Sequence, residues 1–188
     1  MLRKILAVAA LVVAASPVQA AEPYKVDTVH SSVIFRVKHM NVSYAYGRFN
    51  EIVGTFDLDE TNPAQSKLDI KVATASIDTA SKAREGHLQG PDFFSAKQFP
   101  IISFKSTKVA KTSEGAFDVT GDLTLHGVTK PLTLKIEPSG TGKGMKGEKL
   151  AGFETTFSIK RSEFGMTNMT GAIGDDVRLI VSIEGNRP

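Results

Sequence analysis

Two short runs of alternating apolar and polar residues, joined by a tight turn, constrain this chain more than any other segment. The stretch Gly121 to Leu134 reads GDLTLHGVTKPLTL, and its leucines fall at every second position within each run. Successive side chains of a β-strand point to opposite faces, so Leu123 and Leu125 share one face before the turn, and Leu132 and Leu134 share one after it. Such a pattern is typical of antiparallel sheet with one buried face.

Strand-like segments of the same kind follow one another along most of the chain. They are residues 24–29, 32–40, 49–58, 67–77, 101–109, 115–125, 132–137, 152–160 and 177–183. These eight or nine segments predict an all-β fold in which a twisted antiparallel sheet closes on itself to bury a continuous apolar face. The alternation predicts these inward side chains: Phe35, Val37, Phe56, Leu123, Leu125, Leu132, Leu134, Phe153, Phe157, Ile159, Leu179 and Val181.

One helical segment, residues 78–89, interrupts the strands. Asp78 or Thr79 can cap its start, and Gly90 followed by Pro91 ends it. The next segment, PDFFSAKQFP, is rich in phenylalanine but too broken by proline for a central strand. This aromatic loop either plugs one end of the barrel or covers a ligand entrance. Residues 138–149, PSGTGKGMKGEK, are expected to form a flexible polar hairpin loop.

The first twenty residues read as a cleaved signal peptide. Arg3 and Lys4 precede the apolar run ILAVAALVVAA, and Val18-Gln19-Ala20 matches the small-residue cleavage pattern. The remaining residues, 21–188, are expected to form one exported, periplasmic domain. Without Arg3 and Lys4, 21 basic residues face 20 acidic ones, so a large positive field that would bind nucleic acid is unsupported.

The sequence holds few signals for a metal site or a catalytic centre. With four histidines and no cysteine, none of the usual zinc spacings occurs, so no metal site is expected. Asp27, His30 and Ser31 are close in sequence, but neighbours on an extended chain point to opposite sides, which argues against a catalytic triad. No catalytic residue is therefore assigned.

Two polar residues remain candidates for ligand contact. His39 shares the inward face of Phe35 and Val37, where its imidazole could meet a polar group. Arg161 follows Ile159 at the end of a strand, which places a cation at the rim of the enclosed space. It either forms a rim salt bridge with Asp175 or Asp176, or anchors the head group of a ligand.

The chain resembles the YceI family over nearly the whole of residues 21–188. The matching motifs are VDTVHSSVIFRVKHM (26–40), GRF (47–49), SIDT (76–79), HLQGPDFF (87–94), FPIISFKST (99–107), GDLTLHGVTKPLTL (121–134), RSEFGM (161–166) and GDDV (174–177). The resemblance implies an eight-stranded antiparallel lipocalin-like barrel with a helix beside it. It also implies an apolar tunnel that holds a polyisoprenoid chain, such as a quinone tail or an isoprenyl phosphate.

From this resemblance we expect a binding protein that is not an enzyme, needs no cofactor and is a monomer or homodimer. The ligand would be an isoprenoid lipid or quinone, carried, stored or sequestered by the twelve inward residues together with His39 and Arg161. Two alternatives stay open. The barrel could be the active site of a lipid-modifying enzyme, or it could be filled by its own side chains and serve as a partner-binding module.

Overall fold

The computed structural model describes residues 23–59 and 61–188, so the expected signal peptide, residues 1–20, lies outside the described residues. The strands are β1 (Tyr24–Val26), β2 (Ser32–His39), β3 (Ser43–Phe49), β4 (Ile52–Asp57), β5 (Lys67–Ala73), β6 (Ile77–Asp78), β7 (Ile101–Lys111), β8 (Phe117–Leu125), β9 (Val128–Lys143), β10 (Lys149–Lys160) and β11 (Ile173–Arg187). The helices are α1 (Lys82–Gln89) and the short 3-10 turns Pro63–Gln65, Thr74–Ser76 and Arg161–Phe164.

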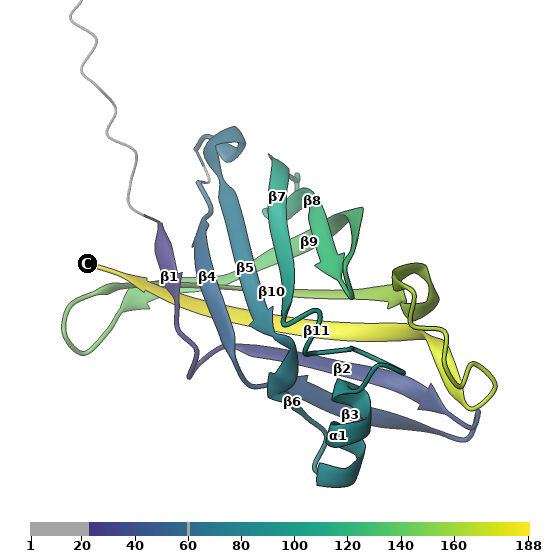
Figure 1. Cartoon of the computed structure of the whole chain (residues 1–188). Coiled ribbons are helices and arrows are strands. Elements are labelled where there is room, and N and C mark those ends of the chain that lie inside the picture. The colour runs from purple at the N-terminus through teal and green to yellow at the C-terminus, as the bar shows by residue number, and fades with distance from the viewer. Residues whose placement is uncertain (1–22, 60) are drawn as a thin grey trace, which may run out of the picture.

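The strands close into an eight-stranded antiparallel barrel, which confirms the predicted fold (Figure 1). β1 and β2 both pair with β11, so together they occupy one position in the barrel. β4 pairs with β1 and β3 pairs with β2, so β4 and β3 together occupy the second position. β5, continued by β6, is the third, and β7, β8, β9, β10 and β11 complete the ring in chain order. Closure leaves the apolar faces of all strands on the inside.

The two ends of the barrel differ. At the closed end, where β1 meets the C-terminal part of β11, the Phe56 ring stacks on Tyr24 at 5.3 Å and meets Phe153 edge-on at 5.1 Å. Phe117 and Ile136 are almost completely buried nearby. The open end is formed by the β2–β3 hairpin, α1 and residues 161–173, and it lies on the opposite side of the molecule from the C-terminus (Figure 1).

The sequence prediction missed β3, although this strand pairs with β2 along its whole length. Its aromatic residues, Tyr44 and Tyr46, are exposed, whereas Ala45 is half-buried and Gly47 is buried. The usual pattern of large apolar residues on the inward face is therefore absent, and alternation of hydrophobicity could not reveal the strand.

Two other local expectations are wrong. Residues 138–149 are mostly strand, because β9 continues to Lys143 and pairs with the start of β10, which leaves only a short turn. α1 starts at Lys82 rather than at Asp78 or Thr79. Asp78 instead lies in β6, and its carboxylate accepts hydrogen bonds from the Ala80 N–H and the Asn50 amide. The end of the helix at Gly90 is as predicted.

Candidate functional site: an apolar cavity at the open end of the barrel

A cavity of about 500 Å³ occupies the open half of the barrel. This volume lies within the range of about 300 to 1,000 Å³ that is usual for small-molecule sites. Its walls come from the inward faces of the strands, from α1 and from the aromatic loop after it. The barrel is therefore not filled by its own side chains.

The inward residues form transverse rows that change in character from the closed end to the mouth. In the row formed by Thr155, Val181, Val33 and Phe49, all but Val181 are buried. In the next two rows, Phe157–Leu179–Phe35–Gly47 and Ile159–Val177–Val37–Ala45, every residue except Gly47 borders the cavity. The outermost pair is His39 and Ser43, so polarity rises toward the mouth.

Small residues on β3 create much of the space in these rows. The inward positions Ser43, Ala45 and Gly47 face much larger side chains on β2. Gly47 is directly opposite Phe35, and a Cβ added there would lie 2.8 Å from Thr79 Cγ2 and closer still to the Phe35 ring. The close approach of this ring therefore requires glycine at position 47.

The aromatic loop after α1 covers one side of the cavity. Phe94 meets Phe49 edge-on with ring centroids 5.7 Å apart, and Phe93 packs against His87 at 5.0 Å. Leu88 of α1 joins them in the cavity wall. The loop therefore forms part of the cavity wall through Phe93 and Phe94, and Phe99 packs elsewhere, against His126.

Polar side chains gather at the mouth, where His39 is exposed beside Ser43. Arg84 of α1 donates from Nε to the Thr79 hydroxyl at 3.0 Å and from a terminal nitrogen to the Thr79 carbonyl. His87 pairs with Asp92 across 3.3 Å. A molecule with one polar end and one apolar end would thus find matching surroundings at both ends of the cavity.

Arg161 is not the exposed rim cation that the sequence predicts. Its side chain is buried, with 4% of the residue exposed, and its guanidinium donates to the carbonyls of Met166 (2.7 Å), Gly174 (3.0 Å) and Ile173 (3.0 Å). Burial lowers the pKa of this guanidinium, and Asp175 opposes that shift. Within the described residues no carboxylate lies within 4.0 Å of it, so the salt bridge expected at the rim is wrong as well.

Asp175 is occupied by Ser162 instead. Its carboxylate accepts hydrogen bonds from the Ser162 N–H and hydroxyl, both at 2.8 Å, and these bonds lower the pKa of Asp175. The salt-bridge partner of Asp176 is Lys160, 3.8 Å away. Arg161 therefore fastens residues 165–174 to the end of β10 and borders the cavity from that position.

The structure places the predicted ligand residues in two groups. Nine of them line the cavity: Phe35, Val37, His39, Leu123, Leu125, Phe157, Ile159, Arg161 and Leu179. The other five point inward but do not line it: Phe56, Leu132, Leu134, Phe153 and Val181. They pack against other side chains of the core. The prediction could not separate the two groups, because alternation shows which face of a strand a residue occupies and not its position along the barrel axis.

About two thirds of the residues in the cavity wall were not predicted from the sequence. Sequence reasoning did not assign Phe49, Phe93, Phe94, Leu88 or Arg84 to a site, although the aromatic loop was recognised as a possible cover. The dense phenylalanines of that loop were the available signal. The residues of α1 carried no such sequence signal, because their role depends on how the helix packs on the barrel. Phe49 was missed because β3, the strand to which it belongs, was not predicted.

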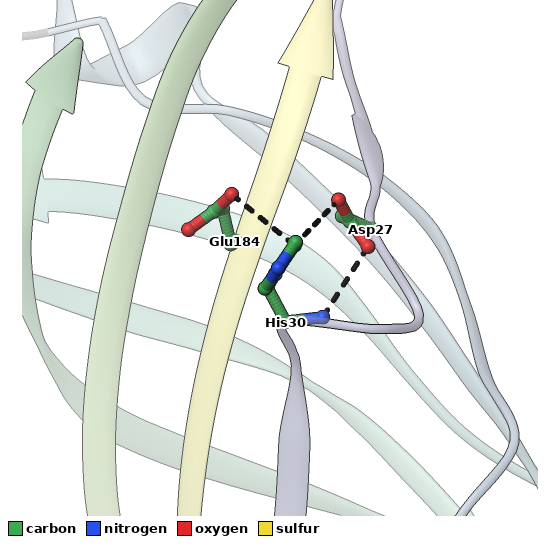
Figure 2. Close-up of side chains that lie close together, drawn as sticks. All are labelled: Asp27, His30 and Glu184. Carbon is green, nitrogen blue, oxygen red and sulfur yellow. Dashed lines mark hydrogen bonds and ion pairs between the residues drawn. The ribbon is translucent and has the colours of Figure 1, made fainter. Parts of the chain in front are cut away.

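A second cluster lies outside the cavity, in the turn between β1 and β2 (Figure 2). Contrary to the prediction from an extended chain, Asp27 and His30 meet, with Oδ2 3.0 Å from Nδ1, and Glu184 Oε1 lies 3.8 Å from the same nitrogen. The hydrogen bond that the His30 ring donates to Asp27 and the charges of both carboxylates raise the pKa of His30, and the same hydrogen bond lowers the pKa of Asp27.

Ser31 does not complete a triad with these groups. Its hydroxyl donates to the carbonyl of Glu184 (3.2 Å) and accepts from the N–H of Glu184 (3.1 Å). Ser31 therefore joins the turn before β2 to the backbone of β11. Asp27 also accepts a hydrogen bond from the Val29 N–H at 2.8 Å. These contacts are those of a salt-bridged turn.

Comparison with known proteins places the chain in a well-populated group. The family model described as YceI-like domain matches residues 24–185. A UPF0312 protein of Yersinia enterocolitica is 42% identical over 184 residues, covering 97% of this chain and 95% of that protein. A UPF0312 protein of Yersinia pestis is 40% identical over 182 residues, covering 96% and 94%.

Solved structures share the same fold. BcnA of Burkholderia cenocepacia matches with a TM-score of 0.77 and 27% identity over 85% of this chain and 99% of that one. The YCEI protein of Campylobacter jejuni matches with a TM-score of 0.71 and 34% identity over 80% and 90%. A polyisoprenoid binding domain from Saccharophagus degradans has a TM-score of 0.68 at 15% identity over 88% and 98%, which is a likeness of fold. No helix among the described residues has the length and apolar character to cross a membrane.

Proposed function

The chain belongs to the YceI-like domain family, and from that premise we propose that it binds a long-chain isoprenoid lipid, of the quinone or isoprenyl phosphate type, in the cavity at its open end. The single observation that carries the proposal is the form of this cavity, whose walls are mostly apolar and whose mouth carries the exposed polar residues His39 and Ser43. One fold neighbour is a polyisoprenoid binding domain, which agrees with this ligand class.

The energetics favour recognition by the tail. Each methylene group removed from water contributes about 0.8 kcal/mol, so even part of an isoprenoid chain in the cavity outweighs one polar contact at the mouth. His39 and Arg84 are placed to meet a head group, whereas the three carbonyl bonds of Arg161 commit it to the protein. Affinity should therefore depend strongly on tail length and weakly on the head group.

The alternatives have less support. Ser43 and His39 are paired in register at the mouth, but among the described contacts no hydrogen bond joins them and no third group orients them, as a nucleophile and base require. A partner-binding module with a filled barrel conflicts with a cavity of about 500 Å³. A carrier or storage protein in the periplasm, exported by the expected signal peptide, fits the cavity best.

Extraction and mass spectrometry of the purified protein test this proposal, together with titration by quinones of increasing tail length. We expect a stoichiometric isoprenoid in the extract and an affinity that rises with each isoprene unit until the cavity is filled. Ala45→Phe, which adds a ring inside the cavity, should weaken binding. Ala110→Phe adds the same ring on the exposed face of β7 and should leave binding unchanged. An empty extract with no affinity for any tail length would refute the proposal.

A further inference from the structure

We propose that the open end of the barrel docks on an anionic lipid bilayer, with the tip of the β2–β3 hairpin inserted between the lipids. This inference rests on the proposed function, because it names the surface from which the cavity takes its ligand. Three features of the mouth suit a bilayer surface: exposed apolar side chains, tyrosines and basic residues.

Apolar side chains project from two adjacent turns at the mouth. In the turn between β2 and β3, 57% of Met40 and 86% of Val42 are exposed to solvent. The Met40 N–H donates to the carbonyl of Ala172 at 2.6 Å, which joins this turn to the one that carries exposed Met169. Clustered exposed apolar residues mark interaction surfaces, whereas single ones do not.

Tyr44 and Tyr46 extend the cluster onto the outer face of β3, where both are exposed. A tyrosine ring with a polar hydroxyl suits the boundary between lipid tails and head groups. The Arg36 guanidinium lies 4.3 Å from the centre of the Tyr44 ring, and the Lys38 ammonium lies 5.8 Å from it. The aromatic residues are thus interleaved with cations.

The charge on this face is positive. In register on the outer face, Arg178 of β11 is opposite Arg36, which is opposite Tyr46, and Lys38 is opposite Tyr44. Asp176, the acidic residue nearby on β11, is paired with Lys160. Residues 21–188 together are almost neutral, with 21 basic and 20 acidic groups, so this local excess is a feature of the open end. It complements a bilayer that contains anionic lipids.

The docked surface and the cavity mouth coincide. Tyr44, Tyr46 and Met169 belong to the exposed cluster and also border the cavity. A lipid tail could then pass between bilayer and cavity without crossing bulk water, where each exposed methylene group is unfavourable. A protein partner would not require apolar tips and a basic face to surround the cavity entrance.

Flotation of the protein with vesicles tests the proposal, using phosphatidylcholine alone and phosphatidylcholine mixed with phosphatidylglycerol. We expect binding to the mixed vesicles that weakens in high salt. Arg36→Gln combined with Lys38→Gln should weaken it about 30-fold, and Val42→Asp about tenfold. Lys25→Gln with Lys108→Gln, and Val29→Asp, make the matched changes away from the mouth and should bind as wild type.

Titration of each variant with a short-tailed quinone, without vesicles, separates this proposal from the previous one. Unchanged quinone affinity with lost flotation is the expected result for the hairpin variants. The docking proposal would be overturned, and the proposed ligand would stand, in either of two cases. The wild-type protein could bind quinone but float with neither kind of vesicle, or the hairpin variants could float as well as wild type. Failure of the wild type to bind quinone while it still floats would overturn the ligand and leave the docking surface standing.

Discussion

The closed and open ends of the barrel share the long strands β10 and β11, yet one end is solid and the other is hollow. Phe153 and Phe157 point inward from β10 four residues apart, but Phe153 packs against Phe56 whereas Phe157 borders the cavity. The difference comes from the neighbouring strands, because β3 contributes Ser43, Ala45 and Gly47 at the open end. Small residues on one strand thus leave space in the open half of the barrel that side chains fill in the closed half.

The largest contrast is expected from removing one ring at each end. Phe56 is 2% exposed, and Phe56→Ala should lower the free energy of unfolding by about 3 to 5 kcal/mol because it leaves a cavity in the packed end. Phe157→Ala should cost about 1 to 2 kcal/mol, since its ring already borders open space. Urea unfolding of the two variants measures both. If both variants lost the same unfolding free energy, the distinction between a packed closed end and a hollow open end would be contradicted.

The open end is nevertheless anchored by Arg161. Arg161→Ala leaves one buried carbonyl (Met166) and two half-buried carbonyls (Ile173 and Gly174) without this donor, and it should cost about 3 kcal/mol of unfolding free energy, with loss of order in residues 165–174. Lys160→Ala removes only an exposed ion pair with Asp176 and should stay within about 1 kcal/mol of wild type. Hydrogen exchange of residues 165–174 checks the local effect. An Arg161→Ala variant as stable as Lys160→Ala would show that the guanidinium is not an anchor.

Two glycines offer a milder comparison of the ends. A Cβ at Gly185 would lie 2.6 Å from the Phe56 ring and 3.0 Å from the Lys25 carbonyl, so Gly185→Ala should cost about 1 to 3 kcal/mol. Gly47→Ala should cost less, because the Phe35 ring can move into the cavity, but it should weaken quinone binding. Unfolding and titration of both variants separate these effects. The reverse assignment, with binding lost only in Gly185→Ala, would contradict the placement of the site.

The smallest effect is expected at the turn between β1 and β2. Since the pKa of His30 is raised in the folded protein, its charged form stabilises the fold below the pKa of an unfolded histidine, and this contribution is lost as pH rises through the raised value. Asp27, whose pKa is lowered, stabilises the fold above its unfolded pKa and loses that effect as pH falls through the lowered value. Unfolding of wild type and His30→Gln at pH 5.5 and pH 8.5 should show a small difference at the lower pH alone. A larger difference at pH 8.5 would reverse the sign of the argument.

Much of the barrel could be predicted from alternation because one face of each strand is buried. Leu123 and Leu125 lie on the inward face of β8 as expected, and both border the cavity. β3 could not be predicted in this way, since its inward side chains are small and its large ones face solvent. The hollow half of the barrel therefore depends on the strand with the weakest apolar signal.

The candidate site was harder to predict than the fold. The sequence could not show that Arg161 would be surrounded by carbonyls, because these come from Met166 in an irregular segment and from Ile173 and Gly174 at the start of β11. Nor could it show that Asp27 and His30 meet, which depends on a turn where an extended strand was assumed. Depth along the barrel, which separates Phe157 from Phe153, is likewise set by pairing between strands.

Methyl NMR of the labelled protein tests most directly whether the ligand occupies the hollow half. On addition of a neutral quinone with an isoprenoid tail, we expect shifts of the methyl signals of Val37, Leu125, Ile159 and Leu179, which line the cavity. The signals of Leu134, Ile136 and Ile183, in the packed core, should stay in place. Shifts confined to those core residues, or no shift at the cavity residues while the quinone binds, would contradict the assignment of the open end as the lipid site.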